Sequence, residues 1–167
     1  MATELKDNLN SDNPDFSSLN NYKIAIVVSE WNKDITNLLK NGAIKILAKY
    51  GFDEKNIIIK YVPGSFELPL ASKYLIDYAN VDGVISLGCV IEGKTKHFDY
   101  VCLGVTQGIM DININTGIPV AFGVLTTKNK QQAEERAGGK YGNKGEDAAL
   151  TVLKMLKIKT ELMDEKK

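Results

Sequence analysis

The chain of 167 residues has no excess of charge of either sign, because 21 lysines and arginines balance 21 aspartates and glutamates. It therefore creates no net field that would attract nucleic acid or an anionic membrane surface. Its apolar runs are also shorter than the roughly 20 residues that a membrane-spanning helix needs. We expect neither a nucleic-acid partner nor a membrane-embedded segment.

Cysteine and histidine are scarce, with two cysteines, Cys89 and Cys102, and a single histidine, His97. These residues match no metal-ligand spacing, and two thiols inside apolar segments do not indicate a disulfide framework. We therefore expect reduced, buried thiols, no metal site and a cytoplasmic location.

The first 21 residues lack the apolar core of a secretory signal and are rich in Asn, Asp and Ser. This polar composition predicts a flexible arm over residues 1–21. At the other end, a charged tail is expected over residues 161–167. The residues between them, 22–160, are enough to bury an adequate core in one domain.

Short, nearly continuous apolar runs predict strands that are buried on both faces of a parallel sheet. Segments between and after them repeat apolar residues every three or four positions, which is typical of amphipathic helices. This alternation, with short links, predicts right-handed βαβ units in a three-layer α-β-α sandwich with a four-stranded parallel sheet. The expected strands are Lys23–Val28, Ile57–Val62, Gly83–Ile91 and Pro119–Leu125, and the helical patterns cover residues 35–47, 66–78, 101–109, 131–137 and 149–156.

Ligands bind such sheets outside the carboxyl ends of the strands, and the rare residues of this chain gather there. The only tryptophan, Trp31, follows the first strand, where its ring can stack on a heteroaromatic ligand. The alternative is that it packs under a loop or in a subunit contact. His97 follows the third strand and is suited to proton transfer near neutral pH. The alternative is a surface histidine with no task.

Two loops at this edge have the character of binding segments. Gly93–His97 combines two lysines, a threonine and a helix start, which favours an anion site, although a solvated helix cap is the alternative. It lacks the first glycine of a Walker A loop. In Pro63–Glu67, exposed backbone groups can bind the edge of a planar ring, and Glu67 can bind hydroxyls or simply favour the helix start.

The segment from Glu134 to Gly145 contains four glycines and three basic residues, which do not describe a simple helix. Arg136 within it can hold a phosphate through two parallel hydrogen bonds. The alternative is a basic hinge between two helices.

Taken together, several segments between Tyr22 and Leu156 resemble the 6,7-dimethyl-8-ribityllumazine synthases in order and spacing. The resemblance implies a flavodoxin-like sheet and the penultimate step of riboflavin synthesis, without a metal or organic cofactor. In that step 5-amino-6-(D-ribitylamino)uracil condenses with 3,4-dihydroxy-2-butanone 4-phosphate, and phosphate and water are released. The segments are Pro63–Glu67, Gly88–Val101, Pro119–Thr127, Glu135–Gly138 and Gly142–Gly145.

The resemblance also implies roles for individual residues. His97 would transfer protons, and Asp147 would orient His97 or Lys144. A second group would bind the pyrimidine and its ribityl chain, and a third would surround the phosphate. The second group is Trp31, Gly64, Ser65, Phe66, Glu67, Val90, Ile91, Phe122 and Lys144, and the third is Lys94, Thr95, Lys96 and Arg136.

In the family Phe122, Arg136 and Lys144 would come from a neighbouring subunit, so the resemblance implies self-association. Family members form pentamers, and some assemble twelve pentamers into a 60-subunit shell. The short link Ala137–Gly145 carries no insertion and favours the shell. Association with riboflavin synthase is a further possible partnership that the family implies.

The chain departs from the family at Glu92, where many relatives carry arginine, and at Lys94 and Lys96, which replace smaller residues. Three other functions remain as alternatives. A flavin- or lumazine-binding shell protein would lack catalysis, and a phosphosugar enzyme would form a Schiff base through Lys94 or Lys96. A flavodoxin-type electron carrier is disfavoured, because the first strand is not followed by a phosphate loop.

Overall fold

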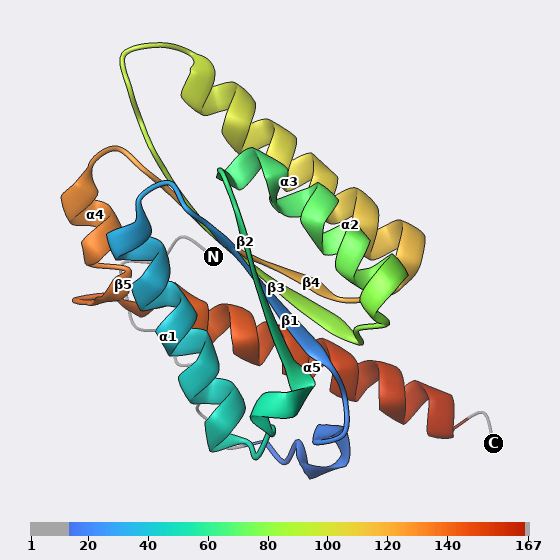
Figure 1. The fold of residues 1–167 in the computed structure, drawn as a ribbon. Coiled ribbons are helices and arrows are strands. Elements are labelled where there is room, and N and C mark those ends of the chain that lie inside the picture. Colours follow the sequence, from blue (N-terminus) through green and yellow to red (C-terminus); the bar gives the residue numbers. More distant parts are fainter. Residues whose placement is uncertain (1–13, 166–167) are drawn as a thin grey trace.

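The computed structural model describes residues 14–165, and a four-stranded parallel sheet in the order β2-β1-β3-β4 forms its middle layer (Figure 1). All strand pairs are parallel, and Val28 of β1 lies opposite Tyr61 of β2 and Leu87 of β3. The four expected strands are confirmed, with ends that differ by at most two residues. The strands are β1 (Ile24–Ser29), β2 (Ile57–Val62), β3 (Gly83–Ile91) and β4 (Val120–Thr127).

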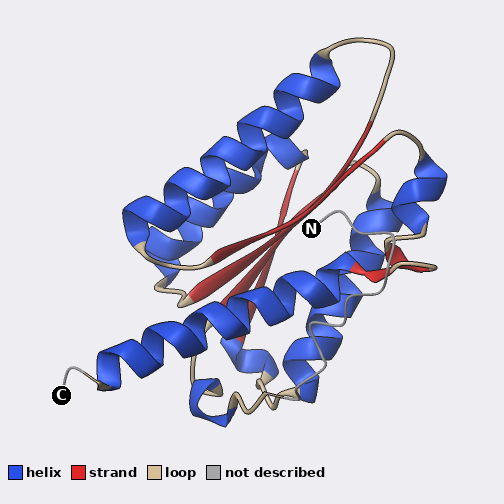
Figure 2. Ribbon diagram, turned by 180° about the vertical axis from the view of Figure 1, so that it is seen from behind, coloured by secondary structure: helices blue, strands red, loops and turns tan. Residues whose placement is uncertain are grey.

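Two helices cover each face of the sheet, which confirms the three-layer sandwich (Figures 1 and 2). On one face lie α1 (Lys33–Lys49) and α5 (Lys144–Asp164), and on the other lie α2 (Leu68–Ala79) and α3 (His97–Thr116). The short helix α4 (Lys130–Glu134) lies beside α1. Within residues 14–165, no helix is both long and apolar enough to cross a bilayer.

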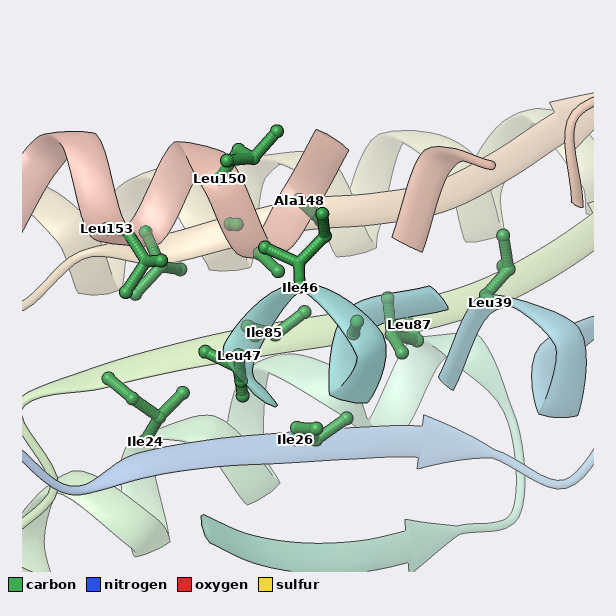
Figure 3. Close-up of a cluster of buried hydrophobic side chains, with 14 of the residues drawn as sticks. Ile24, Ile26, Leu39, Ile46, Leu47, Ile85, Leu87, Ala148, Leu150 and Leu153 are labelled. Atoms are coloured by element: carbon green, nitrogen blue, oxygen red, sulfur yellow. The ribbon is translucent and has the colours of Figure 1, made fainter. Parts of the chain in front are cut away.

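The central strands β1 and β3 are buried on both faces, and this explains their unbroken apolar runs. The prediction was wrong for the edge strand β2, where only Val62 is buried and Lys60 and Tyr61 are exposed. Every residue of β1 is buried. Ile24 and Ile26 face α1 and α5 in the cluster that Figure 3 shows, whereas Ala25 and Val27 face α2 and α3. Burial of such side chains contributes about 1.5–3 kcal/mol for each large aliphatic residue. The core therefore fixes the sheet, and the strand ends with it.

Helices α1 and α5 approach each other closely, because glycines lie at their contact. A Cβ atom at Gly145 would lie 1.9 Å from the carbonyl oxygen of Leu39 in α1. One at Gly42 of α1 would lie 2.5 Å from Cγ of Asn143, which precedes α5. The Asn143 side chain donates a hydrogen bond to Leu38 O at 2.9 Å and so joins the two helices.

The helix expected over residues 131–137 was wrong in its second half. Helix α4 ends at Glu134, and a two-stranded antiparallel hairpin follows, made of β5 (Ala137–Gly139) and β6 (Gly142–Asn143). Gly138 and Gly142 adopt φ angles of 119° and 79°, which glycine reaches without a steric penalty and a right-handed helix does not use. The glycine-rich composition therefore encodes a turn.

The expected terminal segments also need correction where the structure describes them. Residues 1–13 of the expected arm lie outside the described residues, but Phe16 and Leu19 are buried in the core, 1% and 0% exposed. Phe16 packs edge-on against Tyr50 at 4.9 Å between ring centroids. At the other end α5 continues to Asp164, so the expected tail is helical for most of its length. Apolar burial and helix propagation outweigh the polar composition of both segments.

We predict that Gly145→Ala lowers the free energy of unfolding by about 1–3 kcal/mol or more, because the new methyl group must push α5 away from α1. Thermal or urea unfolding measures this loss. Gly93→Ala is the control, since a Cβ there meets no atom within 4 Å. Equal stability of the two variants would contradict the close approach.

Candidate functional site

An open cavity of about 610 Å³ lies at the carboxyl ends of β1, β2 and β3, beside the first turns of α3. It brings together eight of the residues expected at the site, from four separate segments of the chain. Five further residues line the cavity without having been predicted as individual site residues, although Pro63 belongs to a loop that was predicted to bind. The eight are Trp31, Gly64, Ser65, Phe66, Glu67, Val90, Ile91 and His97, and the five are Asn32, Pro63, Cys89, Tyr100 and Val101.

Exposed aromatic rings form the rim of this cavity. Trp31, Phe66 and Tyr100 are 72%, 59% and 70% exposed. The Phe66 ring lies against α3 where Gly104 has no side chain, since a Cβ there would be 2.6 Å from the ring. These flat surfaces are available for stacking on a planar ligand.

The backbone around Trp31 is fixed by two hydrogen bonds to the neighbouring loop. The amide of Trp31 donates to Pro63 O at 3.2 Å, and that of Glu30 donates to Val62 O at 2.8 Å. The indole therefore projects from an anchored backbone although its ring is exposed. A fixed backbone reduces the conformational freedom that is lost when a ligand stacks on the ring.

The loop after β2 is shaped by Glu67, whose Oε2 accepts a hydrogen bond from the Gly64 amide at 2.9 Å. This contact matches the structural alternative for Glu67, a favourable charge at a helix start. It leaves Oε1 without a hydrogen bond among the described residues. The hydroxyl of Ser65 is buried against Gly88 and also has no partner among residues 14–165.

Cys89 lines the cavity but is 2% exposed. Burial, and to a lesser extent the charge of Asp34, raises the pKa of its thiol to about 12. The thiol is therefore neutral at physiological pH and is a poor nucleophile. The expectation of a reduced, buried thiol is met here, and Cys102 is also free but only partly buried.

His97 is the first residue of α3 and is exposed at the cavity. Its amide donates to Thr95 Oγ1 at 3.4 Å, so the threonine hydroxyl faces the start of the helix. Lys94, Thr95 and Lys96 are exposed and do not line the cavity. They lie on the loop between β3 and α3, which extends beyond the end of the sheet (Figure 1).

Phe122, Arg136, Lys144 and Asp147 also lie outside the cavity lining. Phe122 is 42% exposed on the edge strand β4. Lys144 forms an ion pair with Asp147 at 2.6 Å between Nζ and Oδ2. The hairpin that follows Arg136 packs against α1, on the sheet face opposite α2 and α3 (Figures 1 and 2).

Asn32, which was not among the predicted site residues, joins the ends of β1 and β3 across the cavity. It has a left-handed backbone, with φ 56° and ψ 45°, and its Nδ2 donates to Cys89 O at 2.8 Å. Asparagine tolerates this conformation better than other residues with a side chain. An asparagine between a strand and a helix could have indicated a left-handed turn there. It could not have indicated the hydrogen bond, because the partner Cys89 is 57 residues away in the chain.

The fold and the cavity define a class of protein: an α/β protein whose candidate ligand site, rimmed by exposed aromatic rings, lies at the carboxyl edge of a parallel sheet. His97 supplies a group that can transfer protons at that edge. Within residues 14–165, no cluster of three or more His, Cys, Asp or Glu side chains is suited to hold a metal ion.

A sequence model of the 6,7-dimethyl-8-ribityllumazine synthase family matches residues 21–160. The enzyme of that name from Bacteroides fragilis is 52% identical over 134 residues, which cover 80% of this chain and 94% of the relative. That of Porphyromonas gingivalis is 56% identical over 133 residues, 80% of this chain and 83% of the relative. That of Flavobacterium johnsoniae is 48% identical over 161 residues, which cover 96% of this chain and 85% of the relative.

The chain therefore belongs to the 6,7-dimethyl-8-ribityllumazine synthase family, and it is an enzyme of the transferase class. The resemblance inferred from the motifs and the flavodoxin-like fold are confirmed.

We predict that Asn32→Ala is more damaging than Asn32→Gly. Both lose the hydrogen bond to Cys89 O, but alanine also pays a left-handed backbone penalty of about 1–2 kcal/mol that glycine avoids. Melting temperatures should fall in the order wild type, Asn32→Gly, Asn32→Ala. The fluorescence anisotropy of the only tryptophan, Trp31, should decrease in both variants. An Asn32→Ala variant as stable as wild type would refute the strain.

Proposed function

We propose that the cavity holds 5-amino-6-(D-ribitylamino)uracil while it condenses with 3,4-dihydroxy-2-butanone 4-phosphate to give 6,7-dimethyl-8-ribityllumazine. The observation that carries this proposal is the convergence of Trp31, the Gly64–Phe66 backbone and His97 on one cavity. The indole stacks on the pyrimidine, and Val90 and Ile91 form its slot. The backbone of residues 64–66 and Glu67 bind the ring edge and the ribityl hydroxyls.

The chemistry requires orientation and proton transfer more than a strong nucleophile. The 5-amino group of the pyrimidine attacks the ketone, and a first water leaves to give an imine. Loss of the proton on the carbon beside the imine expels phosphate and leaves an enol, which becomes a ketone by proton transfer. The ribitylamino nitrogen attacks this ketone, and loss of a second water closes the ring. His97 transfers protons during elimination. Holding the two reactants side by side supplies much of the acceleration, since it replaces a bimolecular encounter.

The phosphate half of the site requires a second copy of the chain. Lys94, Thr95 and Lys96 lie on the loop that leads to His97, whereas Phe122, Arg136 and Lys144 are outside the lining of the cavity of their own chain. We propose that a neighbouring subunit supplies these last three, with Arg136 as the phosphate clamp, Phe122 and Lys144 closing the pyrimidine site, and Asp147 holding Lys144.

Exposed apolar side chains support this self-association. They follow one stripe on α2 and one on α3, and these helices lie side by side on the same sheet face (Figure 1). A monomer rarely exposes so large an apolar patch without a partner. The residues are Leu70, Tyr74 and Tyr78 on α2, and Tyr100, Leu103, Met110 and Ile114 on α3, each more than half exposed.

The remaining partner and location predictions rest on the family resemblance and on composition. They are association with riboflavin synthase and a cytoplasmic location. Co-purification of the two enzymes from the source cells, and fractionation of those cells, test them.

Mixing the protein with the two substrates should produce the fluorescence of the lumazine. We predict that His97→Ala lowers turnover by about 10²- to 10⁴-fold, the effect of losing a proton-transfer group. Pyrimidine binding should persist, because stacking and backbone contacts remain. A wild-type protein without lumazine production would end the proposal, and unchanged turnover in the variant at saturating substrate would remove His97 from the mechanism.

We predict that Arg136→Ala raises the KM for the butanone phosphate by about 10-fold or more, because the phosphate loses a bidentate, charge-assisted partner. The KM for the pyrimidine should change far less. Steady-state kinetics with each substrate varied in turn measure both values. Equal increases in the two constants would argue against a phosphate role.

We predict assembly into pentamers and, beyond them, a 60-subunit shell. The link between α4 and α5 is a compact hairpin with no insertion, and a longer link would obstruct contact between rings. From the 18.4 kDa chain, a pentamer is about 92 kDa and a shell about 1,100 kDa, both closed symmetric assemblies. Native mass spectrometry separates them. A pentamer as the sole species across pH and phosphate concentrations would contradict the shell prediction. A stable, active monomer would contradict both the shell and the site shared between subunits.

A further inference from the structure

Arg136 is held in a fixed position by the hairpin that follows it. Its Nη1 donates to Gln132 O of α4 at 3.0 Å, and its guanidinium carbon lies 4.8 Å from the centroid of the Tyr141 ring. The Glu135 carboxylate is 4.0 Å from Nη1, a weak ion pair, and that carboxylate also accepts a hydrogen bond from Gln131. The cation–π contact with Tyr141 therefore positions the guanidinium more than the ion pair with Glu135 does.

Tyr141 is itself anchored by the backbone. Its amide donates to Glu135 O at 2.8 Å, and the strands β5 and β6 pair on either side of the turn that carries it. Asn143 joins this hairpin to α1 through Leu38 O. A continuous set of contacts thus runs from α1 through the hairpin to the Tyr141 ring and on to Arg136.

We infer that Tyr141 is a positioning residue for Arg136 and so determines how tightly the protein binds the phosphate of the four-carbon substrate. This inference rests on the proposed function, in which Arg136 clamps that phosphate. A free arginine side chain loses considerable rotamer freedom when it binds an anion. The Tyr141 ring holds the guanidinium before the phosphate arrives, because a planar cation is attracted to an aromatic face. Most of its N–H donors stay available for the ligand.

Lys140 makes the inference separable from a simple charge effect. Its Nζ lies 5.1 Å from the centroid of the same Tyr141 ring, so the hairpin places two cations beside one aromatic side chain. If the hairpin served only to increase positive charge, the cation of Lys140 would matter and the neutral ring of Tyr141 would not. If the ring orients Arg136, Tyr141 would matter and Lys140 would not.

The test compares Tyr141→Leu, Tyr141→Phe and Lys140→Met in the full-length protein. Tyr141→Leu should raise the KM for the butanone phosphate by about 3- to 10-fold, the range of a cation–π contact. It should leave kcat and the pyrimidine KM unchanged. Tyr141→Phe keeps the ring and should behave as wild type, as should Lys140→Met. Inorganic phosphate as a competitive inhibitor should lose affinity in Tyr141→Leu by the same factor.

A double-mutant cycle makes the test specific to Arg136. In an Arg136→Ala background, Tyr141→Leu should add less than about twofold to the same KM, because its effect passes through the missing guanidinium. Melting temperature and assembled mass, measured on each variant, show whether the hairpin stays folded.

Several results would overturn the inference. The first two are a rise in the butanone phosphate KM of Tyr141→Phe, or of Lys140→Met, as large as that of Tyr141→Leu. The third is an equal rise in the KM values of both substrates in Tyr141→Leu. The fourth is an undiminished effect of Tyr141→Leu in the Arg136→Ala background. If wild type makes the lumazine and Tyr141→Leu is unchanged, only this inference fails. If wild type makes none, the proposed function fails with it.

Discussion

The structure depends on a parallel sheet whose central strands are buried on both faces. Parallel strands need a crossover between each pair, and every strand here ends at the same edge before its helix begins. Because β1 and β3 carry apolar side chains toward both helical layers, neither layer can move away from the sheet without exposing the core. The βα links are therefore held a short distance apart, and they are where polar and aromatic residues can be placed without cost to the core.

The cavity lies at that edge, and hydrogen bonds between the links that follow the strands hold its walls together. The bond from Asn32 to Cys89 O joins the ends of β1 and β3, and the amide of Trp31 joins β1 to the loop after β2. His97 is placed by the helix that it starts. What a single chain offers is thus a slot with aromatic walls and one proton-transfer group. This is suited to a planar heterocycle, whereas the clamp proposed for the phosphate is on another part of the surface.

The sequence was most informative where one physical rule dominates. Apolar runs such as Gly83–Ile91 predict buried strands because both faces of the middle of the sheet exclude water, and the rim residues follow from parallel topology. The sequence did not predict the role of a residue when that role depends on a contact with a distant part of the chain. The partner of Asn32 is 57 residues away, and Phe16 and Leu19 are two apolar residues in a polar segment, too few for a periodic signal.

The hairpin after α4 shows a different limit. Its glycines predict a break in the helix but not the antiparallel pairing that follows, because the positive φ angles of Gly138 and Gly142 depend on the turn that forms. The roles of Phe122 and Lys144 could come only from the family resemblance, whereas the chemistry of a guanidinium already favoured a phosphate-binding role for Arg136. No property of a single chain brings any of the three residues to the cavity.

The central claim is that each active site combines His97 of one chain with Arg136 of another. Co-expression of His97→Ala chains with Arg136→Ala chains tests it most directly. Random mixing in a closed ring would restore both groups at about a quarter of the sites. The account predicts that mixed assemblies are far more active than either variant alone. Activity no higher than the mean of the two pure variants would contradict a shared site.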